Sequence, residues 1–498
     1  MHLNIVAINF ISGISWDQLI YAVRYSLQAP WLLSDFSFVF LFGFFLFGYA
    51  LLSKDVKWRN IYVVAFSLFF YYKSSGPFLL VLACLISSDF LFARLIEKKE
   101  GAKKKILFYL SLIYSLSFLL YFKYSSTIIY NSNEYLGTNF GLNDWFLPLG
   151  ISFYTFQSIS YLVDVYRREV PPVKSITDYA FYMTFFPHII AGPIIRAKDF
   201  VPQLSAPTML NSATYKESMI RITTGLIKKL LIADYLGTYV SLINESPLNH
   251  TGLEHFISMY AFSFQLYFDL SGYADIAIGM SLLLGFRIKE NFDSPYLARN
   301  IRSFWRKWHI SISNWFKDYI YIPLGGNKGK PISSYTLLIF IMVLGGLWHG
   351  MEKRFIVLGL MHGVALVIHK FYLKYFPVQS KSKVFSIIAV LITFHFVSFG
   401  WFFLRASSFD YAIQSLTILF TKTNFMQLYS FTMERPDLII LLIISGGIVF
   451  MPGKLKRYLN DKIMKLPAIS WVFLFLIVLQ LIIQFKGQFS QPFIYLQF

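Results

Sequence analysis

Charged side chains are scarce in this chain of 498 residues. Asp, Glu, Lys and Arg together make up 14% of it, whereas a soluble globular protein contains about 25%. Hydrophobic residues account for 56%, a proportion that is typical of a chain solvated by lipid. Cys84 is the only cysteine, which excludes a disulfide framework and a thiolate metal cluster.

Linkers and internal repeats are also missing. No tract rich in Pro, Gly or Ser divides the chain, and we therefore expect residues 1–498 to form a single membrane domain. Residues 1–30 lack a basic start and a small-residue cleavage site, so they are predicted to be an amphipathic leader and not a cleaved signal peptide. Because many transporters consist of two related halves, the lack of a repeat counts against a polytopic transporter or flippase, which stays the main alternative from another class.

Long apolar runs dominate what is present. A membrane span needs about 20 mainly apolar residues, so the apolar content allows about a dozen spans. The predicted fold class is therefore all-α, a polytopic transmembrane helical protein. The run 179–193 is short and contains Pro187 and Pro193, which favours a re-entrant segment over a full crossing. The predicted runs are 36–52, 61–72, 77–95, 106–122, 145–166, 179–193, 219–243, 256–285, 335–348, 355–373, 384–404, 437–451 and 468–485.

The net charge of +19 does not indicate binding to nucleic acid. The early basic residues lie in short clusters between apolar runs, at 54–59, 94–105 and 167–174, and not along one soluble face. The predicted spans place all three clusters on one side of the lipid bilayer, which the positive-inside rule makes cytoplasmic. A loop predicted at 123–144 then lies on the extracytoplasmic side.

Familiar catalytic patterns are absent as well, and one histidine stands out. The sequence contains no glycine-rich phosphate loop, no pair of histidines at metal-ligand spacing and no serine in a nucleophile elbow, so we expect neither a metal nor a bound cofactor. His349 ends the apolar run 339–350, where an ionisable ring is costly and is a functional candidate. Gly345, Gly346 and Gly350 let a backbone or a substrate approach it closely. The imidazole is either a base or a hydrogen-bonded structural group.

A second histidine, His309, belongs to a basic stretch. Apolar residues between 301 and 319 follow the helical period, while Arg302, Arg306 and Lys317 lie away from that stripe. We therefore predict one amphipathic helix over 301–319 that lies at the membrane surface. It is either an interfacial anchor or a basic surface for the phosphates of an acyl-CoA or for an acidic carrier protein. His309 lies at the edge of the apolar stripe and is expected to point inward.

Seven stretches resemble the membrane-bound O-acyltransferase superfamily, and within it the bacterial branch of alginate O-acetyltransferases and teichoic-acid D-alanyl transferases. Two of them contain the Trp-His-Ile-Ser motif of His309 and the Trp-His-Gly motif of His349. The likeness runs in order from about residue 36 to the end of the sequence. The stretches are 148–157, 186–193, 269–279, 304–311, 321–326, 345–350 and 492–498.

The resemblance implies a fold and a set of site residues. The fold is a ring of tilted helices around a central chamber, with re-entrant and interfacial helices, open to the cytoplasm for the donor and to the other side for the acceptor. The resemblance makes His349 the catalytic base and places His309 in the donor passage. The residues that we expect to bind substrate are Trp305, Trp308, Trp348 and Asp275.

The implied activity is O-acyl transfer in the inner (cytoplasmic) membrane. The acyl group, in first place acetyl, comes from acetyl-CoA or another cytoplasmic thioester, such as an acyl-carrier protein. It passes to a hydroxyl of an extracytoplasmic polysaccharide or cell-envelope glycan, or to an intermediate protein carrier, and the implied partner is an extracytoplasmic SGNH-type acyltransferase. D-alanyl transfer for teichoic acid is the alternative within the family, and a catalytically silent scaffold is a further alternative.

Overall fold

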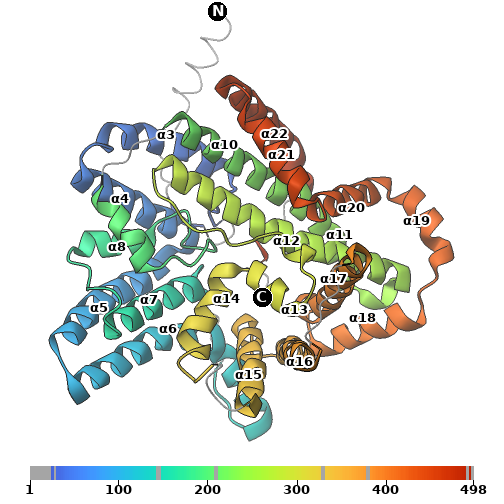
Figure 1. The fold of residues 1–498 in the computed structure, drawn as a ribbon, viewed down its shortest axis with the longest axis horizontal. Coiled ribbons are helices and arrows are strands. Elements are labelled where there is room, and N and C mark those ends of the chain that lie inside the picture. The colour runs from blue at the N-terminus through green and yellow to red at the C-terminus, as the bar shows by residue number, and fades with distance from the viewer. Residues whose placement is uncertain are drawn as a thin grey trace, which may run out of the picture.

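The computed structural model describes residues 24–26, 30–141, 147–206, 211–326, 331–376, 382–489 and 493–494. Every regular element in these residues is a helix, so the predicted all-α class is confirmed. The long helices surround a centre that contains two short ones, α13 (Ile301–Lys307) and α14 (Ile310–Phe316) (Figure 1). The predicted leader, residues 1–30, falls almost entirely outside the described residues.

Four helices form the first quarter of the described chain. The carboxylate of Asp55 caps the second of them, because it accepts hydrogen bonds from the N–H groups of Lys57 and Trp58 at 3.0 and 3.1 Å. The fourth helix continues to Leu136 and ends at Gly137 in the left-handed region, with φ 66°. The loop predicted at 123–144 is therefore wrong over 123–136, since no Pro or Gly interrupts the helix before Gly137. These helices are α3 (Phe36–Leu52), α4 (Val56–Ser75), α5 (Leu79–Lys98) and α6 (Gly101–Leu136).

Two shorter helices, α7 (Ile151–Tyr166) and α8 (Ile176–Thr184), follow. Residues 151–165 of α7 are all buried in the protein. Helix α8 ends at Thr184, ahead of Pro187, so the run 179–193 does not cross the membrane as one helix. The expectation that this run is too short for a full crossing is thereby confirmed. A single turn, α9 (Ala197–Phe200), comes next.

The middle of the chain forms a tightly packed pair of helices. Helix α10 (Ser212–Leu226) continues through a π-helical turn, η3 (Ile227–Ala233), into α11 (Asp234–Glu245). Together they pack against α12 (Gly252–Leu283). A Cβ atom on Gly225 would lie 2.6 Å from the carbonyl oxygen of Gly272. This close approach of two backbones requires glycine on both helices.

Buried charges at this interface are paired. The ammonium of Lys229 contacts the carboxylates of Asp234 and Asp269 at 2.8 and 2.9 Å. The other oxygen of Asp269 accepts a hydrogen bond from the backbone N–H of Ile494 at 2.8 Å, and Lys229 lies over the ring of Phe493. The segment at 493–494 is therefore packed into the core beside α12.

The predicted helix over 301–319 is broken in the structure. Its first half is α13 and its second half is α14, which runs into a π-helical turn, η6 (Lys317–Tyr321). Between them His309 has a φ of 44° in the left-handed region, which no helix accommodates. The helices after this break are α15 (Pro331–His349), α16 (Lys353–Tyr375), α17 (Lys383–Arg405), α18 (Phe409–Thr421), α19 (Leu428–Glu434), α20 (Pro436–Val449), α21 (Gly453–Met464) and α22 (Ala468–Phe489).

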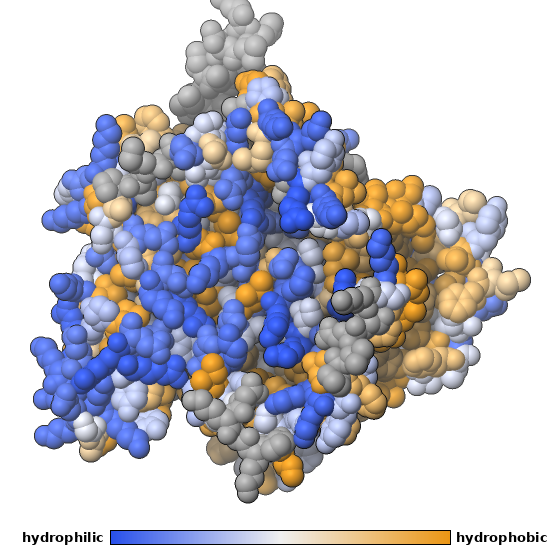
Figure 2. Space-filling view, in the orientation of Figure 1, coloured by the Kyte–Doolittle hydropathy of each residue, from blue (hydrophilic) through white to orange (hydrophobic). Residues whose placement is uncertain are grey.

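The described residues contain five segments that are long and apolar enough to cross a membrane, or six if the bent pair α20 and α21 forms one span. This number is below the predicted dozen, because Val56–Lys98 counts α4 and α5 together. Other helices are short, as α3 and α7 are, or carry the buried charges of α10 to α12. Hydrophilic residues cover much of the face seen in Figure 2, and hydrophobic ones gather around α18 and α19. The five segments are Val56–Lys98, Gly101–Leu136, Ile332–His349, Lys353–Tyr375 and Lys383–Arg405.

Candidate active site

The break between α13 and α14 turns Trp308 and His309 into the protein, where each is 4% exposed. Asn291 holds this break in three ways. Its backbone carbonyl accepts a hydrogen bond from the N–H of Ile310 at 2.8 Å, and its Oδ1 accepts one from the N–H of Ser311 at 3.0 Å. Its Nδ2 lies 3.3 Å from Nδ1 of His309. The ring of His309 is thus oriented by a residue that the sequence did not point to.

Burial keeps His309 neutral. Loss of water around the ring lowers the pKa of His309 to about 3, because burial disfavours the charged imidazolium. The ring of Phe153 stacks on it with centroids 6.1 Å apart. The indole of Trp348 meets its edge at 6.4 Å. At neutral pH His309 therefore offers an uncharged imidazole to whatever enters the space beside it.

His349 is the last residue of α15, where Trp348 precedes it in the chain. Glycines bring α15 close to α16: a Cβ on Gly346 would overlap the carbonyl oxygen of Phe355, and one on Gly350 would lie 2.6 Å from the ring of Phe355. Two of the three glycines named from the sequence thus lie close to Phe355, whereas nothing lies within 4 Å of the Cβ position of Gly345. The ring of Phe355 in turn stacks on His349 with centroids 6.0 Å apart.

These side chains line one cavity of about 220 Å³, which we call the histidine cavity. Most of its other lining residues are apolar, among them Leu266, Leu270 and Ile341. The structure therefore brings together five of the six predicted site residues, although they come from two separate parts of the chain. The histidine cavity is lined by His309, His349, Trp305, Trp308, Trp348 and one unexpected histidine, His362.

Asp275, the sixth predicted residue, lies elsewhere. It belongs to the interface of α10 and α12, where its two carboxylate oxygens contact Arg221 at 2.8 Å and Lys228 at 2.5 Å. It does not line the histidine cavity. Its described contacts are those of a buried ion-pair network that joins two helices.

A second cavity of about 650 Å³ adjoins the first, and we call it the basic cavity. The two share the lining residues Lys317, Tyr321, Leu338 and Leu366, so they lie side by side, and we call the two together the passage. The basic face predicted for 301–319 contributes three of the five Lys and Arg side chains, and α16 contributes the other two and a histidine, which sequence reasoning missed. The basic groups that line it are Arg302, Arg306, Lys317, His369, Lys370 and Lys374.

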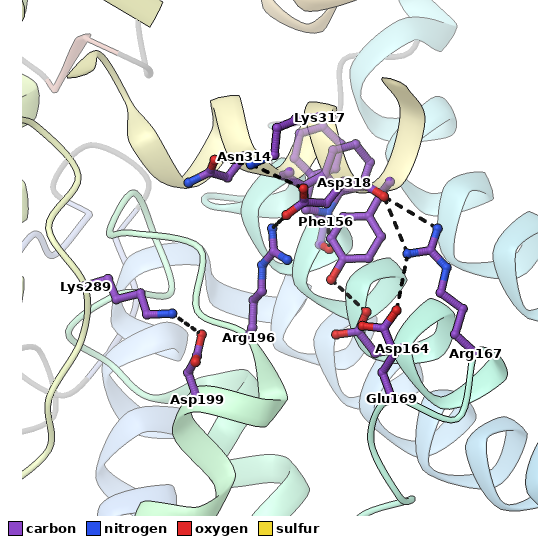
Figure 3. A network of polar contacts seen from close by, with 12 residues as sticks. Phe156, Asp164, Arg167, Glu169, Arg196, Asp199, Lys289, Asn314, Lys317 and Asp318 are labelled. Carbon is purple, nitrogen blue, oxygen red and sulfur yellow. Dashed lines mark hydrogen bonds and ion pairs between the residues drawn. The ribbon is translucent and has the colours of Figure 1, made fainter. Parts of the chain in front are cut away.

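A polar network braces η6, whose Lys317 and Tyr321 line both cavities (Figure 3). Asp318 is paired with Arg196 at 2.7 Å, and the hydroxyl of Tyr319 donates to Asp164 of α7 at 2.9 Å. Nearby, the indole N–H of Trp315 donates to the carbonyl of Phe156 at 2.8 Å. The bonds to Asp164 and Phe156 tie α14 and η6 to the buried helix α7, and the pair with Arg196 ties η6 to the start of α9.

Two further residues near the histidines were missed from the sequence. Lys123 of α6 lies over the ring of Trp348, with Nζ 5.5 Å from its centroid, whereas the sequence placed it at the start of a loop. His362 lies in the predicted run 355–373, and a buried ionisable residue in an apolar run was the available signal. Among the described residues, no group of three or more His, Cys, Asp or Glu side chains is placed to hold a metal ion.

Comparisons with known proteins agree on one family. Residues 51–409 match the model of the MBOAT, membrane-bound O-acyltransferase family. The probable alginate O-acetylase AlgI of Pseudomonas aeruginosa is 36% identical over 393 residues, covering 77% of this chain and 74% of that protein. The peptidoglycan O-acetyltransferase of Helicobacter pylori is 34% identical, with coverage of 76% and 78%. The teichoic acid D-alanyltransferase of Bacillus subtilis is 31% identical, with coverage of 53% and 70%.

Proposed function

The chain belongs to the membrane-bound O-acyltransferase family, and on this premise we propose that it moves an acetyl group from a cytoplasmic thioester to a hydroxyl of a cell-envelope glycan. The family makes it a multi-pass membrane O-acyltransferase, as the sequence motifs predicted. Relatives that are named O-acetylase or O-acetyltransferase support acetyl as the acyl group. We place the enzyme in the inner (cytoplasmic) membrane, as one membrane domain.

The observation that carries the proposal is the pair of adjoining cavities, in which the basic cavity lies beside the histidine cavity that His349 lines. Three lysines and two arginines line the basic cavity, and such groups attract phosphates. The histidine cavity is mostly apolar, with His309 and His349 in its wall. A donor with phosphates at one end and a thioester at the other fits this order of charge and polarity. Acetyl-CoA and an acyl-carrier protein both have this form.

In the proposed reaction His349 acts as the general base. Its imidazole takes the proton of the acceptor hydroxyl while the hydroxyl oxygen attacks the carbonyl carbon of the thioester. The carbon–sulfur bond then breaks, and the leaving thiolate takes up the proton from the imidazolium, so that the products are the ester and the free thiol. His309, held by Asn291, borders the path of the donor. Trp305, Trp308 and Trp348 shape the cavity and exclude water, which favours ester formation over hydrolysis.

The route of the acyl group to its acceptor, and the identity of the acyl group, are two further parts of the proposal. We propose that the acyl group reaches its glycan directly or through an extracytoplasmic SGNH-type partner. The second candidate reaction is D-alanyl transfer, which the likeness to the teichoic acid D-alanyltransferase of B. subtilis favours. Both reactions use an activated thioester, so the passage suits either donor.

Mass spectrometry of cell-surface glycans tests the proposal. Cells without this protein would be compared with cells that carry the wild type or His349→Ala, at matched amounts in the membrane. We expect acetyl esters with the wild type alone. D-alanyl esters in their place would select the second reaction, and a full complement of esters with His349→Ala would identify the protein as a scaffold. Covalent transfer by the purified protein separates an enzyme from a flippase.

A further inference from the structure

His362 lies in the middle of α16 and is 1% exposed. Its ring lines the histidine cavity. Neither Nδ1 nor Nε2 has a hydrogen-bond partner among the residues that the structure describes. Buried polar groups in folded proteins are nearly always hydrogen-bonded, so a buried imidazole with two open positions indicates a missing partner.

The surroundings of His362 explain why the protein itself does not supply that partner. The ring lies against Trp305, Phe396 and Trp401, with centroids 5.2, 5.5 and 6.0 Å away. Gly400 faces it from α17, where a Cβ atom would lie 3.2 Å from Nε2. Aromatic faces and a glycine hold the ring in place, and neither ring nitrogen has a hydrogen bond to them.

The position of His362 along the passage indicates what the missing partner is. His369 and Lys370, which follow His362 by seven and eight residues on α16, line the basic cavity. At 1.5 Å per residue they lie about 10 to 12 Å from His362 along the helix axis. The ring is thus set back from the phosphate end of the proposed donor and lies in the same cavity as His349.

The part of a thioester donor that spans this interval is its pantetheine arm, which contains two amide groups between the phosphate and the sulfur. In a passage lined by groups such as Leu338, Leu358 and Leu366, an amide without a partner is costly. A long acyl chain in the same place would need no hydrogen bond. An imidazole suits an amide, because one ring nitrogen donates and the other accepts.

We propose that His362 binds an amide of the donor's pantetheine arm and so selects donors that carry this arm. The inference rests on the proposed function only in taking a thioester as the donor, and it holds equally for acetyl and D-alanyl transfer. The arm is shared by acyl-CoA and by a phosphopantetheinylated carrier protein. His362 contacts the donor and takes no part in the bond-making step.

Direct binding tests the proposal without any acceptor. Calorimetry on the purified wild type, His362→Phe and His362→Gln would use three probes: coenzyme A, pantetheine and adenosine 3′,5′-bisphosphate. For His362→Phe we expect about tenfold weaker binding of coenzyme A and pantetheine, the loss of one hydrogen bond, and unchanged binding of the bisphosphate. The glutamine variant should recover part of the loss, because its amide also hydrogen-bonds.

Two controls separate this effect from damage to the fold. Arg306→Gln in the basic cavity should weaken the bisphosphate and leave pantetheine unchanged. His395→Phe alters a histidine of α17 whose ring bonds the carbonyl of Leu391, and it should alter neither probe. A carrier protein with its arm, used in place of coenzyme A, shows which source of the arm loses affinity in His362→Phe, and either source supports the proposal.

Two patterns of binding would overturn the proposed role of His362. Pantetheine that binds the wild type and His362→Phe alike, or that binds neither, overturns the proposal. Equal weakening of all three probes by His362→Phe overturns it too, since a disturbed fold and not a lost amide contact explains that pattern. Failure of the proposed glycan acetylation would show in the mass spectra of the glycans, which these binding measurements do not depend on.

Discussion

Replacement of Gly359 by alanine tests whether the packing of α15 on α16 positions the catalytic histidine. A Cβ atom at Gly359 would lie 2.5 Å from the carbonyl oxygen of Met342 and 2.6 Å from Cα of Val343. Both are backbone atoms of α15, so no side chain can move aside. The two helices must separate until the first distance rises from 2.5 to 3.4 Å, by about 0.9 Å. Gly345 on the facing helix has nothing within 4 Å of its Cβ position and is the matched control.

The expected magnitudes follow from this geometry. Overpacking of a filled interface costs about 1 to 3 kcal/mol, and the helix preference of alanine over glycine returns about 1 kcal/mol. We therefore expect Gly359→Ala to lose up to about 2 kcal/mol of stability, whereas Gly345→Ala gains up to about 1 kcal/mol. Since a misplacement of 1 Å can lower a rate by about 100-fold, acetyl transfer by Gly359→Ala should fall at least about tenfold.

The assay combines unfolding in mixed micelles with the rate of acetyl transfer at equal amounts of folded protein. The rate matters because His349 ends the helix that has to move. If Gly359→Ala unfolds and reacts like the wild type, the close packing of α15 on α16 is refuted as the device that positions His349. If Gly345→Ala is as unstable as Gly359→Ala, the loss belongs to the removal of glycine in general.

Three further outcomes are expected. His349→Ala should lower acetyl transfer by at least about 100-fold, the contribution of a general base, while the protein still accumulates in the membrane; product at the wild-type level would contradict the assignment. His309→Ala should mainly raise KM for the donor, and a fall in kcat at saturating donor as large as that of His349→Ala would contradict a role in the passage. In a cysteine-free background, cysteines at Lys104 and Asn133 should be labelled from opposite faces, because 29 residues of continuous helix extend about 44 Å. A cysteine at Lys307 should share the face of Lys104, and labelling from the other face alone would exclude a cytoplasmic donor there.

Much of the fold could be predicted because lipid acts on local composition. Apolar runs at 106–122, 355–373 and 384–404 lie within α6, α16 and α17, since each such run needs no distant partner to be placed in a membrane. The same reasoning predicted about a dozen spans, more than the five or six that the described helices supply by length and composition. A buried helix such as α12 is apolar for a different reason, as it packs against protein on all sides.

The break at His309 could not be predicted, because its cause is distant in sequence. The apolar stripe of 301–319 has the helical period throughout, and local residues favour one helix. Asn291 overrides that preference with three contacts from a loop eighteen positions before His309. Similarly, the pairing of Asp275 with Lys228 depends on how α10 crosses α12, which no local pattern reports.

The sequence motifs identified His309 and His349 but not all of the other residues that line the two cavities. His362 has no motif around it in the predicted run, and its neighbours Trp305 and Trp401 come from other helices. In the sequence, Lys370 and Lys374 lie at the end of a predicted span, yet in the structure they line the basic cavity together with Arg302. A pattern along one helix predicts its face, whereas a cavity depends on three or four helices at once.

The burial of residues 493–494 has a consequence for biosynthesis. The carboxylate of Asp269 accepts the N–H of Ile494, so the ribosome must add more than two hundred residues after Asp269 before this bond can form. A chain terminated ahead of Phe493 would leave the buried cluster of Lys229 and Asp269 without its cover. The cover of this buried cluster therefore forms only after helices α13 to α22 have been synthesised.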